Sequence, residues 1–203
     1  MLNHDTAVAS AASRMVSAAG GRPIIEMGSR RTHEQAAIAA TRAAYLAGFA
    51  STSNLAGGHI YGIPTVGTVA HAFILAHASE RAAFASQVEA LGVDTTLLVD
   101  TYDIEQGIRT AVDVAGPQLG AIRIDSGDLE VESRRARTLL DHLGATQTRI
   151  VVTSDLDEYV ITALEAAPID GFGVGTRVVT GSGHPTAGIV YILVAVAVRP
   201  GSD

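Results

Sequence analysis

The stretch Ile122-Arg123-Ile124-Asp125-Ser126-Gly127-Asp128 is the most informative in the chain, because a short β-branched run ends directly in carboxylates, a hydroxyl and a glycine. Buried parallel strands have short apolar sequences, and the loops at their carboxyl ends carry ligand-binding and catalytic residues. The same pattern returns at residues 97–103 and 150–155. The sequence therefore indicates three acidic strand ends that can converge on one site.

Short β-type runs alternate along the chain with alanine-rich segments of helical period, which is typical of βα units on a largely parallel sheet. Eight such strands favour an α/β barrel over an open sheet. An open sheet remains the alternative, because periodicity does not say whether the first strand closes on the last. The predicted strands cover residues 23–27, 47–52, 62–66, 95–99, 121–124, 149–153, 171–174 and 190–196.

Polar residues at the ends of the alanine-rich segments predict where helices begin and stop. The capping box at residues 32–35 opens a helix, and Gly48 is placed to stop it. Asp103 can cap a second helix, and Ser154, followed by Asp157, can cap a third that runs through Val160 and Leu164.

Composition limits the classes of function. The 203 residues are 47% hydrophobic and carry a formal net charge of -7, so the chain can bury a sizeable core and lacks the clustered cations that nucleic-acid binding requires. The absence of cysteine excludes disulfides, zinc-thiolate sites and thiol nucleophiles. No apolar run approaches the roughly 20 residues that span a bilayer. We therefore expect a cytoplasmic protein with no membrane or nucleic-acid partner.

The segment from Arg123 to Asp128 is the first candidate site. Asp125 and Asp128 bracket a glycine, and such a pair can hold Mg²⁺ and ribose hydroxyls, since hard cations prefer oxygen ligands. The alternative is an ordinary turn with a helix cap. Arg123 favours the binding site, because a charged residue inside an apolar strand needs a partner, and an anionic ligand provides one.

A glycine-rich segment and a histidine are the next candidates. Residues 171–177 place three glycines at alternate positions before Thr176 and Arg177, which suits a phosphate cradle or a strand against which a neighbour packs closely. His71 lies just inside a predicted helix, where it can face the barrel mouth or be merely structural. The chain has no HxH or HExxH spacing, so a catalytic zinc is not expected.

Taken together and in order, these segments resemble nicotinate phosphoribosyltransferase over roughly residues 1–194. The resemblance implies a type II phosphoribosyltransferase α/β barrel. It also implies the transfer of the ribose of phosphoribosyl pyrophosphate to nicotinate, which forms nicotinate mononucleotide and pyrophosphate for NAD salvage, with ATP hydrolysis driving the balance. The matching segments are EMGSRRTHE from Glu26, STSNLAGG from Ser51, YGIPTVGTVAHAF from Tyr61, LLVDTYD from Leu97, IRIDSGDL from Ile122, VTSDLDE from Val152 and GFGVGTR from Gly171.

The resemblance also implies residue roles. The histidine that ATP phosphorylates matches His71, and the positions that contact the pyridine ring match Met27 and Arg30, with Ser53 beside them. The ribose and Mg²⁺ region matches Arg123, Asp125, Ser126 and Asp128, with Asp125 and Asp128 as the metal ligands; neighbouring acidic positions match Asp100 and Asp155, and the phosphate cradle matches Gly173, Gly175 and Thr176.

Both ends of the chain depart from the family pattern. The family begins with an extra domain that closes over a partner subunit's site, and its usual Tyr-Lys-Leu-Val is replaced here at residues 191–194 by Tyr-Ile-Leu-Val. We therefore expect a barrel domain at 1–194, an atypical tail at 195–203, and a chain that is part of something longer. The resemblance implies a homodimer acting on small molecules. The alternatives are a catalytically silent remnant, or a quinolinate-type phosphoribosyltransferase that needs no ATP.

Overall fold

The computed structural model describes residues 2–190, 192, 194 and 195. Its described residues form a six-stranded, all-parallel sheet in the order β2-β1-β6-β5-β4-β3. The strands are β1 (Ile24–Glu26), β2 (Ser51–Thr52), β3 (Thr96–Leu98), β4 (Ala121–Ile124), β5 (Arg149–Val152) and β6 (Gly171–Val174).

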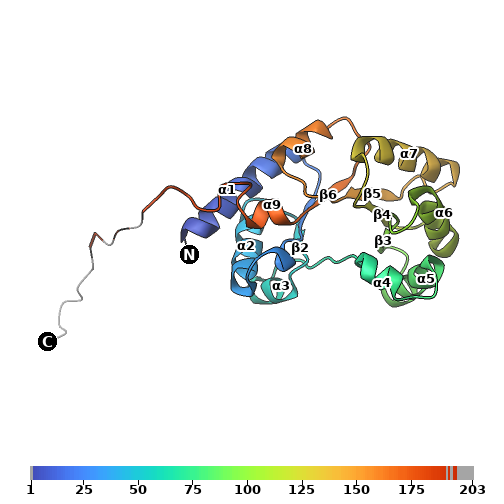
Figure 1. Cartoon of the computed structure of the whole chain (residues 1–203), viewed down its shortest axis with the longest axis horizontal. Coiled ribbons are helices and arrows are strands. Elements are labelled where there is room, and N and C mark those ends of the chain that lie inside the picture. The colour runs from blue at the N-terminus through green and yellow to red at the C-terminus, as the bar shows by residue number, and fades with distance from the viewer. Residues whose placement is uncertain (1, 191, 193, 196–203) are drawn as a thin grey trace.

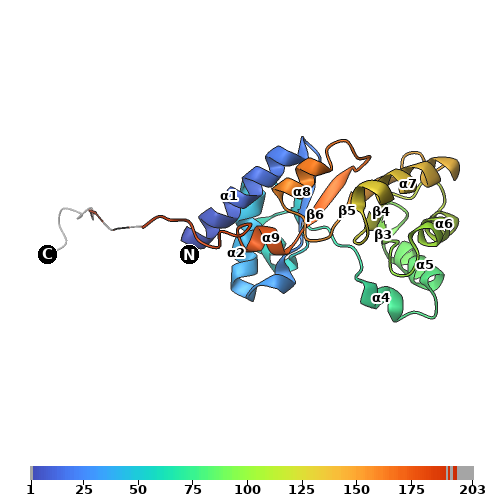
Figure 2. The ribbon, with the colours of Figure 1, turned by 45° about the horizontal axis from the view of Figure 1, so that its top comes forward.

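The strand order is that of a curled sheet, because the last strand lies beside the first. Strand β6 pairs with β1 in the register Ile25 to Gly173, and with β5 in the register Val152 to Phe172. Within the described chain, β2 and β3 are the two edges, and the segment that connects them passes across the opening (Figures 1 and 2). The α/β barrel expected from the sequence is therefore present as a barrel that stays open between β2 and β3.

Helices cover the outside of this sheet. In Figure 1, α1, α2, α3, α8 and α9 lie beside β1, β2 and β6, whereas α4 to α7 lie beside β3, β4 and β5. Their bounds are α1 (Leu2–Ala19), the 3₁₀ turn η1 (Ser29–Arg31), α2 (Glu34–Leu46), α3 (Leu55–Tyr61), α4 (His71–Leu75), α5 (Glu80–Leu91), α6 (Ile104–Ala115), α7 (Leu129–His142), α8 (Glu158–Ala163) and α9 (Thr176–Val179).

The core forms between the sheet and these helices. All four residues of β4 and all four of β6 are buried, as expected for strands covered on both faces. Ile122 and Phe172 are fully buried there, and Met15 brings the apolar face of α1 into the same cluster. Burying each such side chain stabilises the fold by about 1.5–3 kcal/mol, and both fully buried strands end at the candidate site.

The expected helix ends are largely confirmed. Asp103 caps α6 by accepting a hydrogen bond from the Gln106 amide. The cap of α8 is Asp157 and not Ser154, which lies three residues earlier in the turn after β5. The capping residue of α2 was wrongly predicted: Thr32 precedes the cap, and His33 Nδ1 accepts from the Gln35 amide at 3.3 Å.

Two predicted strands differ in the structure. Residues 62–66 form no strand, because Gly62 (φ +67°) ends α3 in the left-handed region and Pro64 has no N–H to donate; Thr65 makes a single bridge to Thr52. The strand expected at 47–52 shortens to Ser51–Thr52, since Gly48 at φ +113° is still turning the chain away from α2.

The expected last strand and tail lie partly outside the described residues. Residues 191, 193 and 196–203 lie outside the described residues, whereas 190, 192, 194 and 195 are in no strand. The division at residue 194 therefore stays a prediction. None of the helices that the structure describes combines the length and the apolar character that crossing a membrane requires.

Candidate active site

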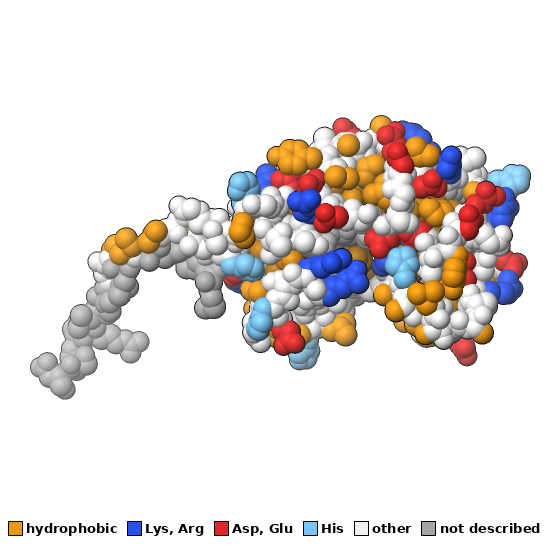
Figure 3. All heavy atoms as spheres, in the orientation of Figure 1, with side chains coloured by type: hydrophobic (Ala, Val, Ile, Leu, Met, Phe, Trp, Pro, Cys, Tyr) orange, Lys and Arg blue, Asp and Glu red, His pale blue; other side chains and the backbone are white. Residues whose placement is uncertain are grey.

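The candidate site is a cavity of about 790 Å³ at the carboxyl ends of β1, β2, β4, β5 and β6. Figure 3 shows basic side chains in the middle of one face of the molecule, with acidic side chains and a histidine beside them. Nine of the predicted site residues line this cavity: Met27, Arg30, Ser53, Arg123, Asp125, Asp155, Gly173, Gly175 and Thr176.

Arg123 is a buried cation at the centre of the cavity floor. Only 11% of its side chain is exposed; Nη1 donates to Thr68 Oγ1, and Nη2 lies 3.8 Å from Asp125 Oδ2. Burial lowers the pKa of the guanidinium, and the charges of Asp125 and Asp100 act against that shift. Its buried Nε has no hydrogen-bond partner among the described residues. An anion in the cavity can supply the partner that this donor lacks.

Asp125 joins Arg123 to a histidine. Thr153 Oγ1 donates to Asp125 Oδ1, and His71 Nε2 lies 3.6 Å from Asp125 Oδ2. The other ring nitrogen of His71 lies 3.1 Å from Thr101 Oγ1, so contacts on both sides orient the imidazole. His71 is the first residue of α4, and its side chain is 41% exposed. A ring fixed at both nitrogens and still open to solvent can exchange a phosphoryl group or a proton.

Asp100 and Ser126 lie next to Asp125, outside the cavity lining. Asp100 Oδ2 accepts from the Asp125 amide at 2.8 Å and from Ser126 Oγ at 2.6 Å, whereas Asp100 Oδ1 is buried without a partner in the described chain. Both residues border a second hollow, between α6 and α7. The structure brings both residues next to Asp125, although they lie outside the lining of the main cavity.

The glycine segment packs closely against its neighbours and lines the cavity. A Cβ at Gly173 would lie 2.5 Å from Thr153 Cγ2 and 2.7 Å from Met27 Sδ, so only glycine fits between these side chains. Gly175 and Thr176 continue along the cavity wall. The packing alternative for the glycines is therefore borne out at Gly173, and it explains how Met27 reaches the cavity.

The turn after β5 adopts a conformation that is rare for residues with a side chain. Ser154 has φ +113° and Asp155 has φ +43°, and both line the cavity. Asp155 Oδ2 lies 3.3 Å from Arg177 Nη2. Such strain is retained where the surrounding structure enforces it, commonly at binding sites.

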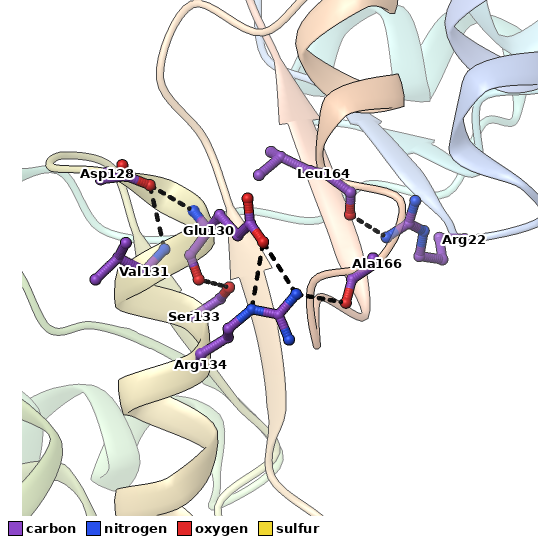
Figure 4. A network of polar contacts seen from close by, with 8 residues as sticks. All are labelled: Arg22, Asp128, Glu130, Val131, Ser133, Arg134, Leu164 and Ala166. Atoms are coloured by element: carbon purple, nitrogen blue, oxygen red, sulfur yellow. Dashed lines mark hydrogen bonds and ion pairs between the residues drawn. The ribbon is translucent and has the colours of Figure 1, made fainter.

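Asp128 is separate from the cavity lining. Its Oδ1 accepts from the amides of Glu130 and Val131 at 3.1 and 3.2 Å, and so caps α7 (Figure 4). The turn-and-cap alternative accounts for these contacts. Its role as a metal ligand stays a prediction.

The sequence reasoning missed four hydroxyl residues: Thr68, Thr101, Thr153 and Ser154. Thr153 and Ser154 end the same apolar run that leads to Asp155, and Thr101 follows Asp100 directly. The strand-end argument that selected the carboxylates could have selected these neighbours too. Thr68 gave a weaker signal, because its role depends on the packing of residues 67–70 against β4.

These features define an α/β barrel protein with a candidate anion site at the strand ends. No protein-family model matches the chain. Nicotinate phosphoribosyltransferase pncB1 of Mycobacterium tuberculosis is 65% identical over 97% of this chain and 46% of the relative, and nicotinate phosphoribosyltransferase of Bacillus subtilis is 41% identical over 97% and 42%. The chain belongs to the nicotinate phosphoribosyltransferase family, and it spans about half the length of these curated relatives.

Solved structures agree with this assignment. Nicotinate-nucleotide pyrophosphorylase from Pyrococcus furiosus matches 89% of this chain and 48% of its own, with a TM-score of 0.83 and 29% identity. Human nicotinic acid phosphoribosyltransferase matches 83% of this chain and 46% of its own, with a TM-score of 0.70 and 25% identity. The incomplete barrel is thus the fold of this family over the part that the chain covers.

Proposed function

We propose that the cavity is a phosphoribosyl-transfer site. It joins nicotinate to the ribose of phosphoribosyl pyrophosphate and releases nicotinate mononucleotide and pyrophosphate, in NAD salvage. The observation that carries this proposal is the buried guanidinium of Arg123, whose Nε has no partner within the described chain and which lies beside Asp125 at the floor of the cavity. The names of relatives at 65% and 41% identity support the same reaction.

The floor suits a ribose that develops positive charge. As pyrophosphate leaves, C1 of the ribose gains oxocarbenium character, and carboxylates fixed nearby stabilise that charge. Asp125, held by Thr153 and by the Asp100 contact to its backbone, and Asp155, held by Arg177, supply fixed carboxylates. Arg123 meanwhile holds phosphate oxygens that carry the leaving negative charge.

The wall formed by Met27, Arg30 and Ser53 suits the pyridine substrate. The Met27 thioether offers a polarizable surface for a ring, and the planar guanidinium of Arg30 can pair with the nicotinate carboxylate. Gly173, Gly175 and Thr176 face the phosphate of the same nucleotide across the cavity. This arrangement orients the pyridine nitrogen toward C1 of the ribose.

His71 couples ATP to the transfer. A nitrogen of its imidazole attacks the γ-phosphorus of ATP, so that an N–P bond forms as the bond to the leaving ADP oxygen breaks. Asp125, 3.6 Å from Nε2, and Thr101, near Nδ1, orient the ring for this step. Hydrolysis of the phosphohistidine then shifts the equilibrium of the transfer reaction toward nicotinate mononucleotide.

The residues present fit Mg²⁺ that arrives with substrate phosphates. Mg²⁺ is usually held by one or two carboxylates together with such phosphates, and the described residues contain no cluster of three or more metal-binding side chains. Asp125 and Asp128 are the ligands implied by the resemblance, and Asp125 lines the cavity. When bound, the ion would neutralise charge on the departing pyrophosphate.

Product formation tests the proposal. The full chain is incubated with nicotinate, phosphoribosyl pyrophosphate and Mg-ATP, and we expect nicotinate mononucleotide, pyrophosphate and ADP. A well-folded chain that forms no product would support the silent remnant instead. A parallel reaction with quinolinate and no ATP tests the other alternative, and product there but not with nicotinate contradicts the proposal.

The assembly and location implied by the resemblance are part of the same proposal. We expect a homodimer in the cytoplasm, acting on nicotinate, phosphoribosyl pyrophosphate and ATP. Sedimentation equilibrium of the chain, with and without phosphoribosyl pyrophosphate, measures the oligomeric state; a monomer under both conditions contradicts the homodimer.

A further inference from the structure

Glu26 is a buried carboxylate that the proposed reaction does not use. It ends β1 with only 1% of its surface exposed, and it accepts three hydrogen bonds. Oε1 accepts from the Gly28 amide, whereas Oε2 accepts from Thr52 Oγ1 at 2.6 Å and from Thr41 Oγ1 at 3.0 Å. The three donors are a backbone amide and two hydroxyls, so one side chain joins β1, β2 and α2.

One of these bonds fixes the loop that carries Met27 and Arg30. The Gly28 amide lies on the carboxylate, and a Cβ at Gly28 would come within 2.9 Å of Glu26 Oε1 and 2.2 Å of Val179 Cγ1. The Arg31 amide donates to the Gly28 carbonyl at 2.8 Å and so continues the turn. The position of Arg30 in the cavity therefore depends on how Gly28 sits against Glu26.

Glu26 also fixes the segment that carries Ser53. Its backbone carbonyl accepts from the Ser53 amide at 2.8 Å, and its side chain holds Thr52. Thr52 Oγ1 in turn accepts from the Asn54 amide at 3.0 Å. Ser53 is thus held between two contacts that both lead to Glu26.

We propose that Glu26 is the positioning residue for the pyridine-facing wall of the cavity. It lies behind the lining and sets the distance between the Met27–Arg30 loop and Ser53 without touching substrate. Burying a carboxylate is costly unless every oxygen is satisfied, whereas binding groups must be held to within about 0.5 Å of their productive positions. A single buried acceptor shared by both wall segments meets that requirement. This role rests on the proposed function.

The test compares Glu26→Gln with Thr148→Val in the full chain. Glutamine keeps the shape of the side chain but replaces one acceptor oxygen with an NH₂ donor. That NH₂ group must face either the Gly28 amide or the two threonine hydroxyls, all of which donate to Glu26. Thr148 is also buried, and its Oγ1 donates to the Leu119 carbonyl at 2.9 Å just before β5, at the amino end of the sheet. The control therefore loses one buried hydrogen bond far from the wall.

We expect Glu26→Gln to raise the KM for nicotinate about tenfold, the equivalent of one hydrogen bond, with kcat within about threefold of wild type. Thr148→Val should leave KM within about twofold, since its lost bond lies outside the site. Equal rises in KM for both variants, or no rise for Glu26→Gln, would overturn the proposal.

A second measurement does not depend on nicotinate turnover. Amide hydrogen exchange at Gly28 should accelerate at least about tenfold in Glu26→Gln and stay at the wild-type rate in Thr148→Val, because only the first variant alters the Gly28 acceptor. Unchanged exchange at Gly28 overturns the positioning role. Faster exchange at Gly28 in Glu26→Gln, together with a wild-type chain that binds no nicotinate, would contradict the proposed function and leave the Glu26 contact established.

Discussion

The Asp100 carboxylate holds the backbone of Asp125: its Oδ2 accepts the Asp125 amide at 2.8 Å and Ser126 Oγ at 2.6 Å. The end of β3 is thereby tied to the end of β4, although the two residues are 25 positions apart in the sequence. Since Asp125 contacts His71 and Arg123, this bond sets the position of the whole cavity floor.

Replacing Asp100 should therefore cost stability as well as geometry. Asp100→Ala leaves the part-buried Asp125 amide and the exposed Ser126 hydroxyl without this acceptor, and we expect the free energy of unfolding to fall by about 1–3 kcal/mol. Asp100→Asn retains one acceptor oxygen and should cost less. Urea denaturation measures both, with Asp103→Ala as control, where an exposed helix cap is worth about 1 kcal/mol. Equal losses for Asp100→Ala and Asp103→Ala would contradict the structural role.

Arg123 should link anion binding to thermal stability. Saturating pyrophosphate should raise the Tm of the wild-type chain by about 5 °C, because a ligand that binds only the folded state stabilises it. In Arg123→Met that rise should disappear, since the buried guanidinium is lost. Arg149→Met, which removes an exposed arginine at the start of β5, is the control and should keep the rise. A full shift in Arg123→Met, measured by scanning calorimetry, rejects Arg123 as the anion ligand.

Glu158 should make the fold sensitive to acid. Burial alone would raise the pKa of this carboxyl, but hydrogen bonds from Ser182 and Arg14 outweigh it and hold the pKa below its ordinary value of 4.5. Because the folded-state pKa lies below the unfolded one, the stabilisation is complete above about pH 4.5 and is lost as pH falls through the folded-state pKa.

Glu158→Gln should remove this part of the pH dependence. We expect it to cost about 1–2 kcal/mol at pH 7, since Arg14 is partly exposed and its ion pair is screened. The difference between wild type and variant should shrink below pH 4.5. Denaturant titrations between pH 3 and 7, at intervals of roughly one pH unit, measure this difference in the free energy of unfolding. A difference that stays constant with pH shows that Glu158 acts by packing alone.

The strained backbone at Ser154 should lower the stability of the fold. Ser154→Gly relieves a backbone held at φ +113° and should raise the free energy of unfolding by about 1 kcal/mol, after the greater unfolded-state entropy of glycine is deducted. Ser10→Gly, inside α1, should instead lower it by about 0.5–1 kcal/mol. Thermal denaturation compares the two. A destabilised Ser154→Gly would mean that the hydroxyl contributes more than the backbone strain costs.

The sequence predicted the local parts of this structure best. The apolar runs before Asp100, Asp125 and Asp155 are strands or end in strand-flanking turns, because period and residue type report burial directly. The cap at Asp103 was also predictable, because its hydrogen bond joins residues only three positions apart in the sequence.

Features that depend on distant packing could not be predicted. Residues 62–66 look like a strand, yet Pro64 and the turn at Gly62 leave only one bridge to β2, so the barrel stays open there. The fit of Gly173 between Thr153 and Met27 and the burial of Glu26 likewise depend on neighbours from other strands. The roles of the site residues came from the resemblance, because a single strand-end motif also fits a turn with a cap.

Phosphate transfer from ATP to His71 is the step that distinguishes the proposed enzyme from a silent remnant. The full chain is incubated with ATP labelled in the γ-phosphate, and the site is mapped by mass spectrometry, with His71→Asn and His77→Asn as matched variants. We expect an acid-labile phosphate on His71 in the wild type and in His77→Asn. It should be absent from His71→Asn and should be discharged by nicotinate with phosphoribosyl pyrophosphate. A folded wild-type chain that takes up no label, or equal labelling of His71→Asn, would contradict it.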